Sequence, residues 1–120
     1  MKIENIKFKA KRLDNGKWAE GSLVTTKLLG WDEPMTEIVA IDGTRYEVDP
    51  STICQFTGLK DCENQDIYEG DILAEKEHPE FEVGYIDYTF AAAYVGDDRF
   101  IFNLLALSEA CKVCGNKFDN

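Results

Sequence analysis

The sequence predicts a mainly β protein of antiparallel hairpins, with a small SH3-like or barrel-like core and at most one short helix near the C-terminus. Apolar side chains recur mostly at every second residue, which is the spacing of strands with one buried face. The pairs Asn15-Gly16 and Asp42-Gly43 interrupt this alternation, and such pairs favour tight hairpins. With 120 residues, of which 44% are hydrophobic, the chain has material for one modest core. We therefore expect one domain, residues 1–120, comprising a hairpin lobe at about 1–50 and a barrel-like core at about 51–120.

The first half of the chain predicts two hairpins. In residues 6–11 apolar and cationic side chains alternate, so a half-buried strand would carry a cationic outer face. Asn15-Gly16 supplies two residues that tolerate positive φ, as a tight turn requires, and Trp18 begins the return strand. Asp42-Gly43 repeats this pattern between strands 37–41 and 45–48, which follow a loop over residues 28–36. Asp49-Pro50 ends the second hairpin, because proline lacks an amide donor.

The second half predicts further strands and one helical segment. A short strand over 53–56 leads into residues 57–72, TGLKDCENQDIYEGDI, which are rich in glycine, acidic groups and amides. The expected elements that follow are strand 71–74, one long strand 81–90, strand 99–103, a helix over 104–109 and the segment 111–114 that ends in a second cysteine.

Charge is distributed unevenly along the chain. Residues 1–17 sum to +4, whereas the other 103 residues sum to −14. A basic arm thus precedes an acidic body, and an acidic body repels the phosphate backbone of nucleic acids. General nucleic-acid binding is therefore disfavoured, and only the arm could contribute to it. The candidate interaction residues of this basic arm are Lys7, Lys9, Lys11 and Arg12.

Several short segments resemble one known family. They are residues 6–10 (IKFKA), Asp49-Pro50, residues 55–61 (QFTGLKD), residues 67–72 (IYEGDI) and residues 113–116 (VCGN). Together they resemble the successive motifs of the YopX family over nearly the whole chain. The resemblance implies a small phage or prophage protein with a mainly β, barrel-like fold and no assigned activity. Two positions depart from the family pattern: Lys11 stands where many members have tryptophan, and Cys114 stands at an apolar core position.

The motif segment 57–72 allows a structural and a metal-binding interpretation. Glycines permit backbone conformations closed to other residues, and aspartates accept hydrogen bonds from backbone amides in turns. The alternative makes Asp61, Glu63, Asp66, Glu69 and Asp71 oxygen ligands for calcium or magnesium, but their spacing is not that of a calcium loop. We predict a turn. The residues to which this structural role is assigned are Gln55, Thr57, Gly58, Leu59, Lys60, Asp61, Ile67, Tyr68, Glu69, Gly70, Asp71, Gly115 and Asn116.

Four cysteines raise the possibility of structural zinc. Cys111 and Cys114 have the two-residue gap of a zinc knuckle, and Cys54 and Cys62 could complete four thiolates. The spacing of the second pair is poor for zinc, and a free cysteine in a core behaves as a small hydrophobe. We expect reduced thiols that bind no metal, and no cofactor.

The sequence also argues against catalysis and a membrane location. The single histidine, His78, lies in a polar segment, and the three serines lack the context of a nucleophile. Charges are scattered through the first dozen residues, where a signal peptide would need an apolar stretch, so we expect the cytoplasm of a bacterial host cell. No stretch without charges is long enough to span a membrane.

Three functional hypotheses follow. The first is a β-rich phage accessory protein that self-associates or binds a host or phage protein. The second is nucleic-acid binding through the basic arm, and the third is an acidic surface that mimics nucleic acid. For self-association, the arm would lie on a neighbouring copy, with Trp18, Trp31 and Phe100 as apolar contacts; the alternative is that it packs on its own subunit.

Overall fold

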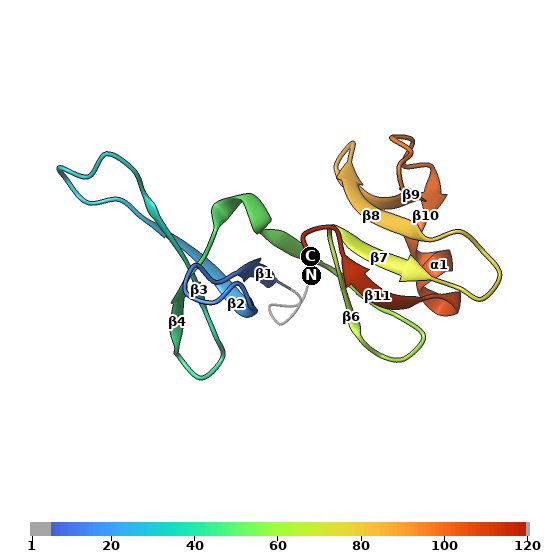
Figure 1. Ribbon diagram of the computed structural model, residues 1–120, viewed down its shortest axis with the longest axis horizontal. Coiled ribbons are helices and arrows are strands. Elements are labelled where there is room, and N and C mark those ends of the chain that lie inside the picture. The colour runs from blue at the N-terminus through green and yellow to red at the C-terminus, as the bar shows by residue number, and fades with distance from the viewer. Residues whose placement is uncertain (1–5, 120) are drawn as a thin grey trace. The chain divides into compact units, whose positions relative to one another are not determined.

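The computed structural model describes residues 6–119 (Figure 1), and the chain divides between Gln55 and Phe56 into two compact units. Both units are built of antiparallel strands, and among the described residues there is a single α-helix, of seven residues, near the C-terminus. The predicted fold class, mainly antiparallel β with one short C-terminal helix, is confirmed. The SH3-like comparison and the single domain stay predictions.

The first unit is a sheet of short strands in the order β4-β3-β2-β1-β5. Its elements are β1 (Phe8–Lys11), β2 (Trp18–Thr26), β3 (Met35–Val39), β4 (Arg45–Glu47), a 3₁₀ helix η2 (Pro50–Thr52) and the first residues of β5 (Cys54–Lys60). Strand β1 is central, because it pairs with β2 along its whole length and with β5 at Phe8 and Lys9.

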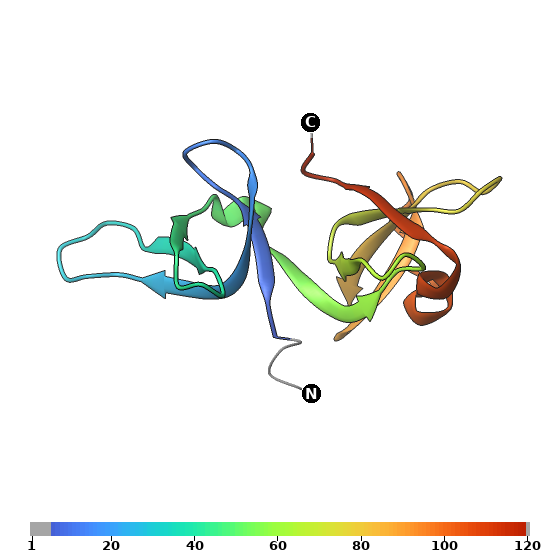
Figure 2. The same ribbon diagram turned by 90° about the horizontal axis from the view of Figure 1, so that it is seen from below.

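Beyond β4 the chain returns to β1, so that the sheet curls back on its first strand (Figure 2). Arg12 forms an isolated bridge with Val48, and the Leu13 amide donates to the Glu47 carbonyl at 3.0 Å. The curled sheet encloses a small core of Ala10, Ala19, Ile38 and Val48. The two alanines leave room for the larger side chains at the centre of so short a sheet.

Both hairpins predicted in this unit are confirmed, but neither has a two-residue turn. The amide of Arg12 donates to the Lys17 carbonyl at 2.8 Å, which leaves four loop residues, and Ala40 pairs with Thr44 around a three-residue loop. In each loop the glycine takes the left-handed conformation, with φ of 71° at Gly16 and 89° at Gly43. The preceding Asn15 and Asp42 keep negative φ. In these longer loops, one glycine with positive φ is therefore enough to reverse the chain.

The second unit contains a sheet in the order β10-β9-β8-β7-β11 and the pair β5–β6. Its further elements are β6 (Asp66–Tyr68), β7 (Asp71–Ala74), β8 (Phe81–Ile86), β9 (Thr89–Tyr94), β10 (Phe102–Asn103), α1 (Leu104–Ala110) and β11 (Lys112–Asn116). The core comprises Ile67, Leu73, Phe81, Val83, Ala92, Leu104 and Cys111. Helix α1 closes one side of this core through Leu104, and its first turn is capped by Asn103, whose side chain accepts from the Ala106 amide at 3.1 Å.

The prediction of one long strand over 81–90 is wrong. The segment folds into the hairpin β8–β9, in which Ile86 pairs with Thr89 around Asp87 and Tyr88. Both turn residues have positive φ, 50° and 65°, which is the two-residue turn that usually carries Asn-Gly or Asp-Gly. A tyrosine in this position is not typical of a turn. The alternation of side chains therefore predicted one continuous strand across the turn. The predicted strand 99–103 is shortened to Phe102–Asn103.

The hairpin at Asp87 predicts that Tyr88→Gly stabilises the protein. A residue with a Cβ is disfavoured in the left-handed region by about 1 kcal/mol, and the Tyr88 side chain, 94% exposed, contributes little packing that could be lost. We expect the thermal unfolding midpoint to rise by about 4 °C. Thr89→Gly, one residue further in extended backbone, is the control and should lower the midpoint. Equal losses in both variants would contradict this description of the turn.

Candidate functional site

The motif segment is organised around two buried carboxylates, of which Asp61 is the first. Its Oδ1 accepts from the amides of Glu63 and Gln65, each at 2.8 Å, and its Oδ2 accepts from the amide of Val113 at 2.8 Å. One side chain therefore closes the turn between β5 and β6 and also fixes the start of β11, 52 residues away. The reversal is completed by Asn64, which has a positive φ of 66°.

The electrostatics of Asp61 favour its ionised form. Burial works to raise the pKa of this carboxyl, but the amides of Val113, Gln65 and Glu63, together with the charge of Lys112, lower the pKa below its usual value. Both oxygens face N–H donors, and a metal ion placed there would meet the same positive dipoles. Within residues 6–119, no three acidic, cysteine or histidine side chains gather as a ligand set.

The second buried carboxylate, Asp71, joins β6, β7 and β11. Its Oδ2 accepts from the Tyr68 amide at 2.7 Å, and its Oδ1 accepts from the Asn116 side-chain amide at 2.9 Å. Between Tyr68 and Asp71 the chain turns at Gly70, which has a φ of 84° and whose amide donates to the Val83 carbonyl at 2.7 Å. The Gly70 carbonyl in turn accepts from the Lys117 amide at 2.9 Å.

The other motif residues also contact backbone or core. Strand β5 has extra residues opposite β6, and Gly58 takes a φ of 85° there. Beside it, the Thr57 hydroxyl donates to the Ile67 carbonyl at 2.7 Å. Leu59 packs against the core, to which Ile67 belongs, and Lys60 forms an ion pair with Asp66 at 3.0 Å. The remaining motif positions are Gln55 in β5, Glu69 in the turn before β7 and Gly115 paired with Ile72.

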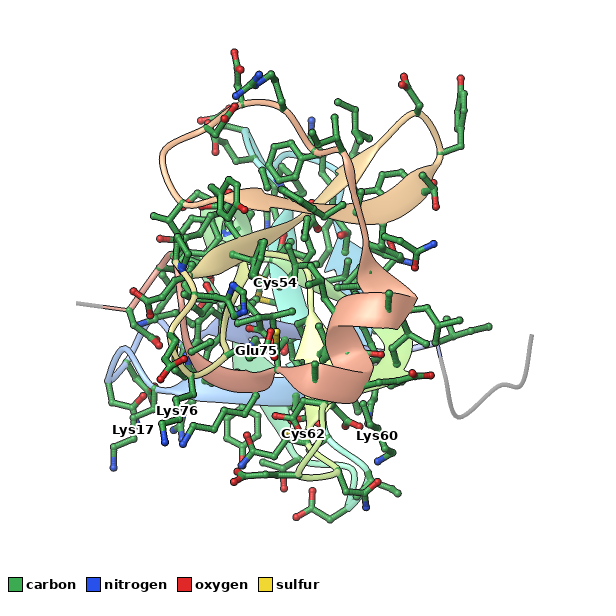
Figure 3. The ribbon with its side chains drawn as sticks, turned by 90° about the vertical axis from the view of Figure 1, so that its right-hand side faces the viewer. Lys17, Cys54, Lys60, Cys62, Glu75 and Lys76 are labelled. Carbon is green, nitrogen blue, oxygen red and sulfur yellow. The ribbon has the colours of Figure 1, made fainter. Side chains whose placement is uncertain are left out.

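The four cysteines lie in different surroundings. Cys54 is buried in the first unit, and Cys111 is buried in the core of the second. Cys62 is exposed on the turn after β5 (Figure 3), and its amide donates to the Cys111 carbonyl at 3.0 Å. Burial, followed by the charges of Glu75 and Cys62, raises the pKa of the Cys111 thiol, which favours the protonated form.

The expectation that Cys114 occupies an apolar core position is wrong. It is exposed and lies at a bulge in β11, where the register against β7 shifts between Val113 and Gly115. Its thiol lies 3.1 Å from a carboxylate oxygen of Glu80. Burial and this hydrogen bond raise the pKa of the Cys114 thiol.

The cationic residues of the basic arm are engaged within their own unit. Lys7 forms an ion pair with Glu20 at 3.6 Å, and the ammonium groups of Lys9 and Lys11 lie 4.7 and 5.2 Å from the centre of the Trp18 ring. Because β1 is a central strand, these side chains are part of a sheet face rather than of a projecting arm.

Arg12 continues this pattern at the end of β1. Its guanidinium stacks on Tyr46 at 4.4 Å and forms an ion pair with Asp14 at 2.6 Å. The hydrogen bond from Arg12 lowers the pKa of the Asp14 carboxyl.

The net negative charge comes almost entirely from the second unit. Residues 56–120 hold fourteen acidic and five basic side chains, a net charge of −9, whereas residues 1–55 hold nine acidic and eight basic side chains, a net charge of −1. The sequence predicts a basic arm and an acidic body. In the structure, the difference in net charge is instead between the two units.

A groove of about 540 Å³ opens on the second unit. It is lined by Thr57 and Leu59 of β5, by residues 89–91 at the start of β9, and by the continuous run 100–105. Among the described residues, none that lines it is charged. Ile101 and Leu105 remain 72% and 56% exposed, which is unusual for large aliphatic side chains that meet in one concavity.

From the sequence no groove is predicted: Phe100 is named only as an apolar contact, Thr57 and Leu59 only as structural motif residues, and the segment FIFNLL, residues 100–105, is not singled out. Phe100 lies close against the backbone of β8, because a Cβ built on Gly84 would stand only 2.5 Å from its ring. Gly84 thus lets the aromatic side chain lie on the sheet and form one wall of the groove. Of the other two aromatic candidates, Trp18 is half-buried beneath the lysines and Trp31 is exposed.

The comparison with protein families agrees with the resemblance of the motifs. Residues 7–120 match the family described as YopX protein, and the chain belongs to this family. A search among curated proteins found no match. The helix that the structure describes is too short to cross a lipid bilayer.

The contacts of Asp61 predict a pH-dependent cost for Asp61→Asn. An asparagine offers one acceptor oxygen and turns an N–H group toward a backbone donor, so the free energy of unfolding should fall by about 2 kcal/mol at neutral pH. Because the folded pKa of Asp61 is lowered, its contribution is present above about pH 4 and is lost as the pH falls through the folded pKa. The difference between wild type and variant in urea unfolding should therefore shrink below pH 4.

The matched control is Asp97→Asn. The pKa of Asp97 is lowered to about 2, chiefly by its hydrogen bonds with Arg99, but these contacts lie within one exposed loop. Its substitution should cost much less than that of Asp61 at neutral pH. Equal costs for the two variants would show that Asp61 does not hold the β5–β6 turn to β11.

The contact between Gly84 and Phe100 predicts a coupled pair of substitutions. Gly84→Ala places a methyl group into the ring of Phe100 and should destabilise the protein by about 1–3 kcal/mol. In a Phe100→Ala background, Gly84→Ala should lower the free energy of unfolding much less, because the added methyl group no longer meets the ring. A double-mutant cycle measured by denaturant unfolding gives the coupling. An unchanged cost in the two backgrounds would mean that Phe100 does not rest on Gly84.

Proposed function

We propose that this protein is a protein-binding β module, an accessory protein of a phage or prophage, and that the groove of the second unit is its binding surface. The observation that carries the proposal is the uncharged lining of this groove in a unit whose net charge is −9. In so acidic a unit, a concave surface without a charged side chain is suited to the apolar centre of a protein interface.

The exposure of the groove residues supports binding of a protein rather than a small polar substrate. Ile101 and Leu105 present aliphatic surface at the rim, and Phe90, Phe100 and Phe102 supply aromatic walls. Side chains of this kind dominate the binding energy of protein interfaces when a partner covers them. Left in water, they would be a site of aggregation.

Nucleic-acid binding through the basic arm has less support. Lys7 lies beside Glu20, and Lys9 and Lys11 lie over Trp18, so a phosphate backbone would compete with contacts that already exist. The unit that holds these lysines has a net charge of −1, and the other unit would repel phosphate.

The test compares two charge substitutions in the tagged protein. Ile101→Asp places a carboxylate in the groove, and Val95→Asp is the matched control, since Val95 is an exposed apolar residue of the same unit outside the groove lining. Protein capture from phage-carrying bacterial cells should fall at least tenfold for Ile101→Asp and stay unchanged for Val95→Asp, with or without nuclease. Equal capture by the two variants, or loss of capture after nuclease treatment, would refute the proposal.

A further inference from the structure

The hairpin β2–β3 of the first unit ends in an exposed apolar turn. Leu28, Leu29 and Trp31 are 56%, 106% and 40% exposed. We call these three residues the hairpin tip. The Trp31 amide donates to the Leu28 carbonyl at 3.1 Å, and Gly30 between them has a φ of 93°, so a defined turn presents the side chains. Figures 1 and 2 show the hairpin, coloured blue to cyan, extending beyond the rest of its unit.

The exposure of the hairpin tip indicates a contact surface. Single exposed leucines are common, but two exposed leucines and an exposed tryptophan within four residues concentrate apolar surface on one turn. Tryptophan is among the residues most enriched where binding energy is concentrated. The ladder between β2 and β3, which runs from Ser22 paired with Val39 to Thr26 paired with Met35, holds the base of this hairpin.

We propose that the hairpin tip of one copy of this protein inserts into the groove of the second unit of another copy. This inference rests on the proposed function and names the partner as a second copy of the chain. The groove, at about 540 Å³, lies within the range of about 300–1,000 Å³ over which protein pockets enclose ligands of the size of a few side chains. It is uncharged where the apolar side chains of the hairpin tip would lie.

Electrostatic repulsion is weaker in this head-to-tail contact than in a symmetric contact between two second units. Contact between the second units of two copies would bring together two surfaces of net charge −9, whereas the unit that carries the hairpin tip has a net charge of −1. Eight of the thirteen basic side chains belong to that unit, including Lys27 at the base of the hairpin tip. Asp32 and Glu33 follow the hairpin tip, and no carboxylate in the groove lining opposes them.

The two surfaces are different, and this has a consequence for assembly. Each copy would offer one hairpin tip and one groove, so every added copy would leave one of each open. Such heterologous contacts continue into a ring if the rotation closes, or into a filament if it does not. If one copy has a defective hairpin tip and the other has a defective groove, the two can form only one contact, and assembly stops at a dimer.

Sedimentation of single variants and of their mixture tests the proposal. Wild-type protein should form species above the monomer mass of 13.6 kDa that grow with concentration. Leu29→Asp, which disables the hairpin tip, and Ile101→Asp, which disables the groove, should each sediment as monomers. Their equimolar mixture should form a species of twice the monomer mass and nothing larger. Val95→Asp should behave like wild type, and circular dichroism should show that all variants are folded.

Several results would overturn the proposal. The first is that the wild-type protein stays monomeric at all concentrations. This result would overturn the proposal even if the hairpin tip bound the groove of its own chain. So would single variants that still assemble, or a mixture that stays monomeric. The proposed function is tested separately: if the wild-type chain is monomeric but its captured partner is lost with Ile101→Asp, the groove binds a different protein. If Ile101→Asp changes neither assembly nor capture, both proposals fail.

Discussion

Hydrogen bonds from backbone amides to two buried carboxylates hold the second unit together. Backbone amides that have no partner within a sheet ladder are costly to leave buried without another acceptor. Asp61 satisfies three of them, and Asp71 satisfies the Tyr68 amide while it also binds the side chain of Asn116. Both carboxylates connect the turns around β6 with β11, which follows some 50 residues later. Helix α1 and the run 100–105 are placed between these fixed points, so the groove depends on contacts that lie outside it.

Local signals in the sequence were sufficient where one residue type determines the backbone. Asn15-Gly16 and Asp42-Gly43 marked the hairpins β1–β2 and β3–β4 of the first unit, and the short helix before Cys111 was located to within one residue. In the motif segment, Gly58 and Gly70 have positive φ, and Asp61 and Asp71 accept hydrogen bonds from backbone amides; the structural role of the segment stays a prediction. The turns and the helix are therefore determined by residues that lie within a few positions of them in the sequence.

Other features depend on contacts between distant segments, and the sequence pattern could not supply them. The turn at Asp87 and Tyr88 has no glycine, because the pairing of β8 with β9 holds two ordinary residues in the left-handed region. The groove combines β5, the start of β9 and residues 100–105, and its Phe100 wall needs the missing side chain of Gly84. The lysines of β1 were expected on an outer face, and only the sheet order shows that Trp18 lies against them.

Protein binding is assigned here to surfaces with little charge on a strongly acidic protein, and hydrogen–deuterium exchange at increasing protein concentration tests this assignment most directly. Residues 28–31 and 100–105 should gain protection together as the concentration rises. The turn at Asp87 and Tyr88, which is exposed to solvent and belongs to neither surface, should exchange at the same rate at every protein concentration. Exchange that is independent of concentration in both segments, or protection that appears in the turn instead, would contradict the account.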